Sequence, residues 1–123
     1  MSGRQRDFLA RVVAEMEHDP SHVPGPRELA RALGTPPQAI EEILRLGVAA
    51  GELIQLADDI CMTSARIQCH ADHLRTATAP RPFTPAEARE ILGMTRRIAN
   101  PLLDHFDASG MTARESGRRH FRS

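Results

Sequence analysis

The sequence has no lysine at all, because its sixteen basic residues are all arginine. Without lysine these residues contain neither a phosphate-loop signature, GxxxxGK[ST], nor a Schiff-base lysine, so nucleotide hydrolysis of that kind is excluded. Tryptophan and tyrosine are also absent, and only four phenylalanines occur. Aromatic platforms for stacking unpaired bases are therefore not expected, and any such stacking must come from arginine.

Cysteine is scarce, and neither a signal peptide nor a long apolar run is present. We therefore expect a cytoplasmic protein without a disulfide framework or a membrane segment. The one metal-like group is Cys61, Cys69, His70 and His73, whose spacing fits no zinc pattern, so we expect no metal and no cofactor. No triad-like spacing of nucleophile, base and acid occurs either, and we expect no enzyme activity from this chain.

Charge is distributed unevenly although the formal net charge is zero. Residues 1–80 contain eight arginines and eleven acidic residues, whereas residues 81–123 contain eight arginines and five acidic residues. The carboxyl-terminal part is therefore basic, and it is the better candidate for an anionic partner.

The first half of the chain has the pattern of three helices followed by a hairpin. Apolar residues at helical spacing, with proline and glycine at the ends, predict helices over 1–17, 26–33 and from about 35 to just before Gly51. Thr35-Pro-Pro-Gln38 has the spacing of a capping box at the start of the third helix. Residues 53–56 and 60–63 read as two short strands. This order of elements is that of a winged helix.

The second half has the same order. Residues 64–76 predict a helix, and Thr84-Pro-Ala-Glu87 has the spacing of a capping box that opens a short helix closed by Gly93. Thr95 is then the expected N-cap, with a capping hydroxyl, of a helix that Gly110 ends. Residues 111–114 and 118–122 predict strands around the turn Glu115-Ser116-Gly117.

The two halves repeat at a constant offset of 59 residues. This offset pairs Gly34 with Gly93, Gly51 with Gly110, Phe8 with Ile67, and further prolines, leucines and alanines with one another. We therefore predict two tandem winged-helix modules, residues 1–64 and 65–123, in a mostly α fold with small β-hairpins (α+β).

The arginines of the second module are not explained by the shared scaffold. Arg96 and Arg97 lie in the first turn of the predicted recognition helix, where the helix dipole disfavours cations by roughly 0.3 to 1 kcal/mol each. At the offset of 59, these two arginines and the pair Arg118 and Arg119 correspond to Pro37, Gln38, Asp59 and Ile60. A core shared by both modules cannot require arginine at these positions, so we predict that they bind a partner.

The second module resembles the carboxyl-terminal winged-helix domain of the bacterial selenocysteine-specific elongation factor. The resemblance covers about 40 residues, from Pro82 onward, and the first module is similar to the preceding winged-helix repeat of that factor in a more general way. The resemblance of the second module rests on Leu92-Gly93, Thr95-Arg96-Arg97, Ala99, Pro101-Leu102-Leu103-Asp104, Phe106-Asp107, Gly110, Thr112, Arg114 and Gly117-Arg118-Arg119. The sequence departs from the family pattern at Ser116-Gly117 in the wing and at His120-Phe121-Arg122 in the last strand.

The resemblance implies a function in selenocysteine incorporation. In that family the modules bind the mRNA hairpin that recodes UGA, and the ribosome and selenocysteyl-tRNA are reached only through GTPase and tRNA-binding domains that this sequence does not contain. The implied contacts are phosphates and a flipped-out loop base, for which arginine is chemically suited. The expected RNA-binding residues are Thr95, Arg96, Arg97, Asn100, Arg114, Arg118 and Arg119.

Two other classes of function remain open from the sequence. Tandem winged helices also occur in DNA-binding transcriptional regulators, whose recognition helix enters a major groove. A protein-interaction module is the third class, with the acidic first module as its docking face.

Overall fold

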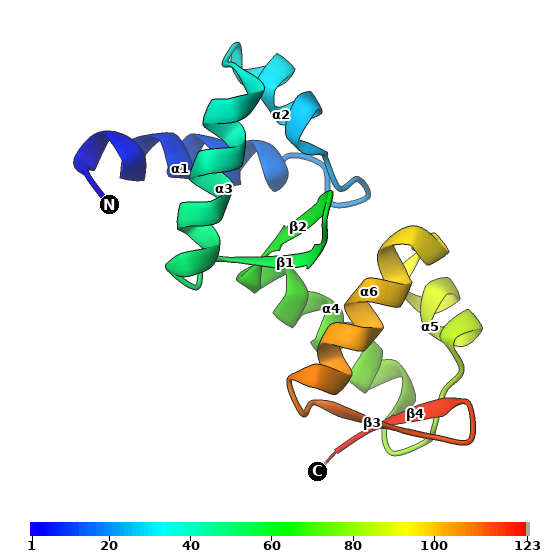
Figure 1. The fold of residues 1–123 in the computed structure, drawn as a ribbon. Helices are drawn as coiled ribbons and strands as arrows, with labels where there is room; N and C mark the ends of the chain where they lie inside the picture. Colours follow the sequence, from blue (N-terminus) through cyan, green and yellow to red (C-terminus); the bar gives the residue numbers. More distant parts are fainter. Residues whose placement is uncertain (123) are drawn as a thin grey trace. The chain divides into compact units, whose positions relative to one another are not determined.

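The computed structural model describes residues 1–122, which fold into two compact units, residues 1–65 and residues 66–122. The first unit contains three helices followed by an antiparallel hairpin (Figure 1). Its buried residues come from all three helices and from the hairpin, as the sequence periodicity predicts. The elements are α1 (Gly3–Met16), α2 (Pro26–Leu33), α3 (Pro37–Ala49), β1 (Leu53–Ala57) and β2 (Ile60–Thr63).

The second unit repeats this order of elements. Its first helix begins at the residue that follows β2, and its hairpin pairs antiparallel, with Phe83 adding an isolated bridge to Arg119 on the second strand. The elements are α4 (Ser64–Thr78), α5 (Pro85–Leu92), α6 (Arg96–Ala108), β3 (Thr112–Glu115) and β4 (Arg118–Phe121). Both units are thus winged helices, and the predicted mostly α fold with two small hairpins is confirmed.

Of the three helix caps predicted at threonines, one is formed, one is displaced by a residue, and one has the predicted residue without its hydrogen bond. The Thr84 and Glu87 capping box at α5 is present, with both reciprocal hydrogen bonds formed. Thr35 does not cap α3, whose N-cap is Pro36, and its hydroxyl has no partner among residues 1–122. The reason is that the ring of Pro37 keeps Pro36 out of the helical conformation, so the helix begins one residue later than a Thr35 cap requires.

The third cap lies at the start of the second module's recognition helix. Thr95 is the N-cap residue of α6, as predicted, but its hydroxyl makes no capping hydrogen bond. Because the Thr95 side chain does not cap this end, the first N–H groups of α6, at its positive dipole end, lack that acceptor.

The repeat holds at an offset of 59 for the central helices and for the start of the first strand of each hairpin, but not for the first helices or the second strands. Helices α2 and α5, and helices α3 and α6, correspond residue by residue, and Gly34 and Gly93 share a φ of 65°. Helices α1 and α4 end 62 residues apart, because residues 17–25 form a connection three residues longer than residues 79–84. The predicted pairing of Phe8 with Ile67 is therefore wrong, and the buried residues Leu9, Val12 and Met16 match Ala71, Leu74 and Thr78.

The second strand of each hairpin shows a similar shift, to an offset of 58. In the first unit the ladder is irregular between Gln55 and Ala57, whereas the second hairpin is a regular ladder closed by Ser116 and Gly117, both at positive φ. Because the first hairpin has one extra residue at this irregularity, Arg118 corresponds to Ile60 and Arg119 to Cys61, not to Asp59 and Ile60 as the constant offset predicted. A two-residue turn with positive φ at both positions matches the twist of the strands.

Candidate nucleic-acid interface

Helix α6 has one buried face and one polar face. Ala99, Leu102, Leu103 and Phe106 are all completely buried. On the polar face Arg96, Asn100 and Asp104 follow one another at intervals of four residues, and all three are exposed. Since residues four apart lie on the same side of a helix, these three side chains form a row along α6.

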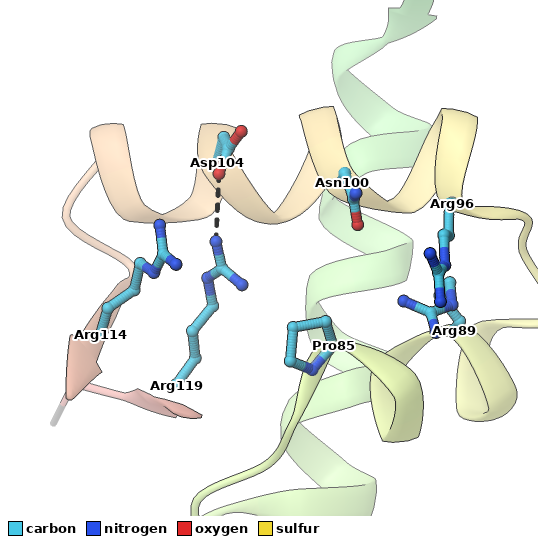
Figure 2. A pocket seen from close by; sticks show the side chains of 7 residues that line it. All are labelled: Pro85, Arg89, Arg96, Asn100, Asp104, Arg114 and Arg119. Carbon is cyan, nitrogen blue, oxygen red and sulfur yellow. Dashed lines mark hydrogen bonds and ion pairs between the residues drawn. The ribbon is translucent and has the colours of Figure 1, made fainter. Parts of the chain in front are cut away.

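This row forms one wall of a pocket of about 240 Å³ in the second unit. The opposite wall comes from α5 and from the hairpin, and Figure 2 shows the side chains that line it. Arg89 and Arg96 lie at one end, Asn100 and Pro85 lie in the middle, and Asp104 lies at the other end with Arg114 and Arg119. Four of the seven lining residues are arginine and one is acidic, so the pocket is suited to an anionic ligand.

The pocket brings together four of the seven residues predicted from the sequence to bind RNA: Arg96, Asn100, Arg114 and Arg119. The other three, Thr95, Arg97 and Arg118, are exposed but do not line it. Thr95 and Arg97 lie at the start of α6, and Arg118 is the first residue of β4.

Arg119 differs from the other predicted residues because its side chain is only 6% exposed. Its Nε donates to Oδ2 of Asp107 at 2.9 Å, and its Nη2 donates to Oδ1 of Asp104 at 3.0 Å. Its backbone N–H and C=O both bond to Phe83. Arg119, which the sequence predicted to bind RNA, thus has its guanidinium against α6, since successive residues of a strand face opposite sides and the exposed Arg118 takes the outer one.

Asp107 joins this arrangement to the other strand of the hairpin. Its Oδ1 accepts a hydrogen bond of 2.6 Å from the hydroxyl of Thr112, which is buried at the start of β3. Asp107 therefore holds both strands against α6, through one hydroxyl and one guanidinium. Charge-assisted bonds of this kind are among the stronger ones in proteins.

The last strand is also held by an aromatic contact at its end. The rings of Phe83 and Phe121 lie 5.7 Å apart, and the guanidinium of Arg75 lies 4.9 Å from the centre of the Phe121 ring. Phe121 is one of the residues where the sequence departs from the family pattern, and this packing gives it a structural role.

Sequence reasoning missed Arg89, Pro85 and Asp104 as parts of the site. A signal for Arg89 was available, because at the offset of 59 it replaces the buried Ala30 of the first unit. The other three lining arginines also have counterparts in the first unit, which the helix offset gives for Arg96 and the hairpin register for Arg114 and Arg119. Arg89, Arg96, Arg114 and Arg119 correspond to Ala30, Pro37, Gln55 and Cys61, so the first unit has arginine at none of these positions.

The cysteines and histidines show no metal-binding geometry in the part of the chain that the structure describes, where no group of three His, Cys, Asp or Glu side chains could hold an ion. Burial raises the pKa of the Cys61 thiol to about 11, so this thiol stays protonated at neutral pH. No helix within residues 1–122 is long and apolar enough to cross a membrane.

The fold and the pocket together define a tandem winged-helix protein with a basic face on its second module. Residues 75–121 match the family model described as "Elongation factor SelB, winged helix". No curated protein sequence matches the chain.

Solved structures that share the fold of this chain include two from selenocysteine-specific elongation factors. One is the mRNA-binding domain of elongation factor SelB from E. coli in complex with SECIS RNA, with a TM-score of 0.79, 24% identity and full coverage of both chains. The other is a bacterial selenocysteine-specific elongation factor, EF-Sec, with a TM-score of 0.72 and 20% identity. The match covers 99% of this chain and 19% of that one, so the chain spans about a fifth of the length of EF-Sec.

Proposed function

We propose that this chain binds the mRNA hairpin that recodes UGA as selenocysteine, and that its second winged helix makes the contacts. The observation that carries the proposal is the arginine-lined pocket between α5, α6 and the hairpin, at positions where the first unit has no arginine. The contact residues are the exposed Thr95, Arg96, Arg97, Asn100, Arg114 and Arg118, to which we add Arg89 from the pocket wall.

The chemistry of these groups favours RNA loops. A guanidinium can bind phosphate through two parallel hydrogen bonds, and its flat face can stack on an unpaired base. Arg96 and Arg97 lie at the positive dipole end of α6, which the Thr95 hydroxyl does not cap and where the helix itself stabilises an anion. A hairpin loop offers both ligands at once, because it exposes phosphates and unstacked bases.

The comparisons support the same choice of partner. The SelB domain from E. coli, which shares this fold over its full length, was solved with SECIS RNA, and the family match covers α5, α6 and the hairpin that form the pocket. Translation places this function in the cytoplasm. GTP hydrolysis and delivery of selenocysteyl-tRNA to the ribosome would belong to other domains of a selenocysteine-specific elongation factor, because residues 1–123 contain no phosphate-loop lysine.

The test is a titration of the chain with labelled hairpins taken from selenoprotein messages of the source genome, against DNA hairpins of the same sequence. We expect RNA to bind at least about tenfold more tightly than DNA. With four exposed arginines on phosphates, the slope of log affinity against log salt should be about −3 to −4. Equal binding to DNA would favour a transcriptional regulator, and a slope near zero would contradict the phosphate contacts.

A further inference from the structure

Asp104 is the one carboxylate among the seven residues that line the pocket. Its side chain is 69% exposed, and one of its oxygens, Oδ1, accepts the Nη2 of Arg119 at 3.0 Å. A carboxylate in a phosphate-binding pocket opposes binding, both by repelling the phosphate and by competing for the arginines. The pairing with Arg119 is what limits this effect.

The first unit shows that a winged helix does not need this ion pair to fold. The hairpin register and the offset of the central helices place Val48, Leu53 and Cys61 where the second unit has Asp107, Thr112 and Arg119. Leu53 and Cys61 are buried in the apolar core of the first unit, and Val48 packs against it. At the position of Asp104 the first unit has Arg45.

Stability alone gives little reason for the exchange. Replacing a buried ion pair by apolar residues of similar volume is often neutral or stabilising. The polar residues Asp107, Thr112 and Arg119 are therefore not expected to make the second unit more stable than apolar residues would. What these polar residues add is the guanidinium of Arg119, whose Nη2 donates to Asp104 while its Nε donates to Asp107.

We propose that Arg119 is a positioning residue of the RNA site and acts through Asp104. It occupies the carboxylate of Asp104, so that Asp104 does not pair with Arg114, which lies at the same end of the pocket (Figure 2). Arg119 itself is too buried to contact a phosphate, with 6% of its side chain exposed. This inference rests on the proposed function, since it assigns a role within the same RNA site.

The first test is a set of four proteins, the wild type, Arg119→Gln, Asp104→Asn and the double variant, titrated with the selenoprotein mRNA hairpin that the wild type binds most tightly. Arg119→Gln frees Asp104 to capture Arg114, so affinity should fall about tenfold near 0.1 M salt, the effect of one lost phosphate contact. Asp104→Asn alone should change affinity less than about threefold. In the double variant, Asp104→Asn should restore most of the affinity that Arg119→Gln loses.

The second test separates positioning of Asp104 from support of the fold. The variant Asp107→Val, Thr112→Leu, Arg119→Cys carries the apolar residues of the first unit, and we expect it to unfold at no lower temperature than Arg119→Gln. Its RNA affinity should still be about tenfold below that of the wild type, and Asp104→Asn should restore it. Arg118→Gln is the matched control, because its loss of affinity should not be restored by Asp104→Asn.

Three results would overturn the inference. If Asp104→Asn raises affinity by the same factor with and without Arg119, the two residues act independently. If the apolar variant binds as tightly as the wild type, Arg119 serves only to anchor the hairpin. If Asp104→Asn does not restore the RNA affinity of an Arg119→Gln protein that is correctly folded, Arg119 itself contacts the RNA. A wild type that binds no hairpin contradicts the proposed function itself, so the two failures are distinct.

Discussion

At the scale of single residues, the two units fill corresponding parts of their cores with side chains of different size. Gly47 in α3 corresponds to Phe106 in α6, and both are buried. The neighbours change in the opposite direction, since the first unit has Leu9 and Leu53 where the second has Ala71 and Thr112. The first unit places a glycine beside two leucines, and the second places a phenylalanine beside an alanine and a threonine. The total volume is approximately conserved, which is how cores tolerate large substitutions.

This exchange predicts that Gly47→Ala destabilises the first unit. A Cβ at residue 47 would lie 2.6 Å from Cδ1 of Leu53 and 3.1 Å from Cδ1 of Leu9, and both leucines are at most 2% exposed. Overpacking should lower the free energy of unfolding by about 1 to 3 kcal/mol, measured by urea denaturation. Gly3→Ala is the control, since a Cβ there meets nothing within 4 Å and should leave stability equal or slightly higher. A Gly47→Ala protein as stable as the wild type would contradict the packing argument.

The adjacent Arg118 and Arg119 show how far residue roles could be read from the sequence. That both are absent from the first unit was correctly predicted, because aligned residues of a repeat can be compared without a structure. Their separate roles could not be predicted, since one extra residue in the first strand of the first hairpin shifts the alignment, and the strand register decides which arginine faces inward. Asp104 and Arg89 belong to the site for a related reason: their place depends on how α5, α6 and the hairpin pack together.

At the scale of elements, the sequence predicted the helices and strands to within a few residues because their ends carry strong local signals. Proline at the first turn and glycine after the last fix α2 and α5, and Gly34 and Gly93 adopt the left-handed conformation that such ends need. The exceptions are caps, because a cap depends on the conformation of the neighbouring residue. Pro37 displaces the cap from Thr35 to Pro36, and the Thr95 hydroxyl does not bond to the turn it precedes.

The capping box of α5 makes the stability of the second unit depend on pH. The hydrogen bond from the Thr84 N–H, with one from Arg81, lowers the pKa of Glu87 below its ordinary value of 4.5. Because the pKa is lower in the folded state, ionised Glu87 stabilises the unit fully above its ordinary pKa of 4.5. This stabilisation is lost as the pH falls through the folded-state pKa. Glu87→Gln should therefore lower stability at neutral pH and approach the wild type as the solution is acidified below about pH 4.5.

Urea denaturation of both proteins at several pH values from about 7 down to about 3 measures this difference. Thr84→Ala, which removes the other half of the box, should cost about 0.5 to 2 kcal/mol at neutral pH and flatten the same pH dependence. A Glu87→Gln deficit that stays constant across the pH range would show that the carboxylate is not the stabilising species.

At the scale of the whole molecule, the two units share a scaffold and divide the basic surface unequally. Both have three helices and a hairpin, yet the lining arginines of the second unit correspond to Ala30, Pro37, Gln55 and Cys61 in the first. A duplicated fold with the pocket arginines in one copy supports the proposal that the second unit makes the RNA contacts. The sequence predicted this division, because charge and repeat are both local properties, whereas the pocket itself required the packed structure.

The central claim is that the arginines at the start of α6 bind the RNA hairpin, and the most direct measurement compares two charge-matched variants. Arg96→Ala, Arg97→Ala removes two arginines from α6, and Arg27→Ala, Arg31→Ala removes two exposed arginines from α2 of the first unit. Both are titrated with the selenoprotein mRNA hairpin near 0.1 M salt. We predict a loss of about a hundredfold for the α6 variant and less than about threefold for the α2 variant. Equal losses would show that only net charge matters and would contradict the claim.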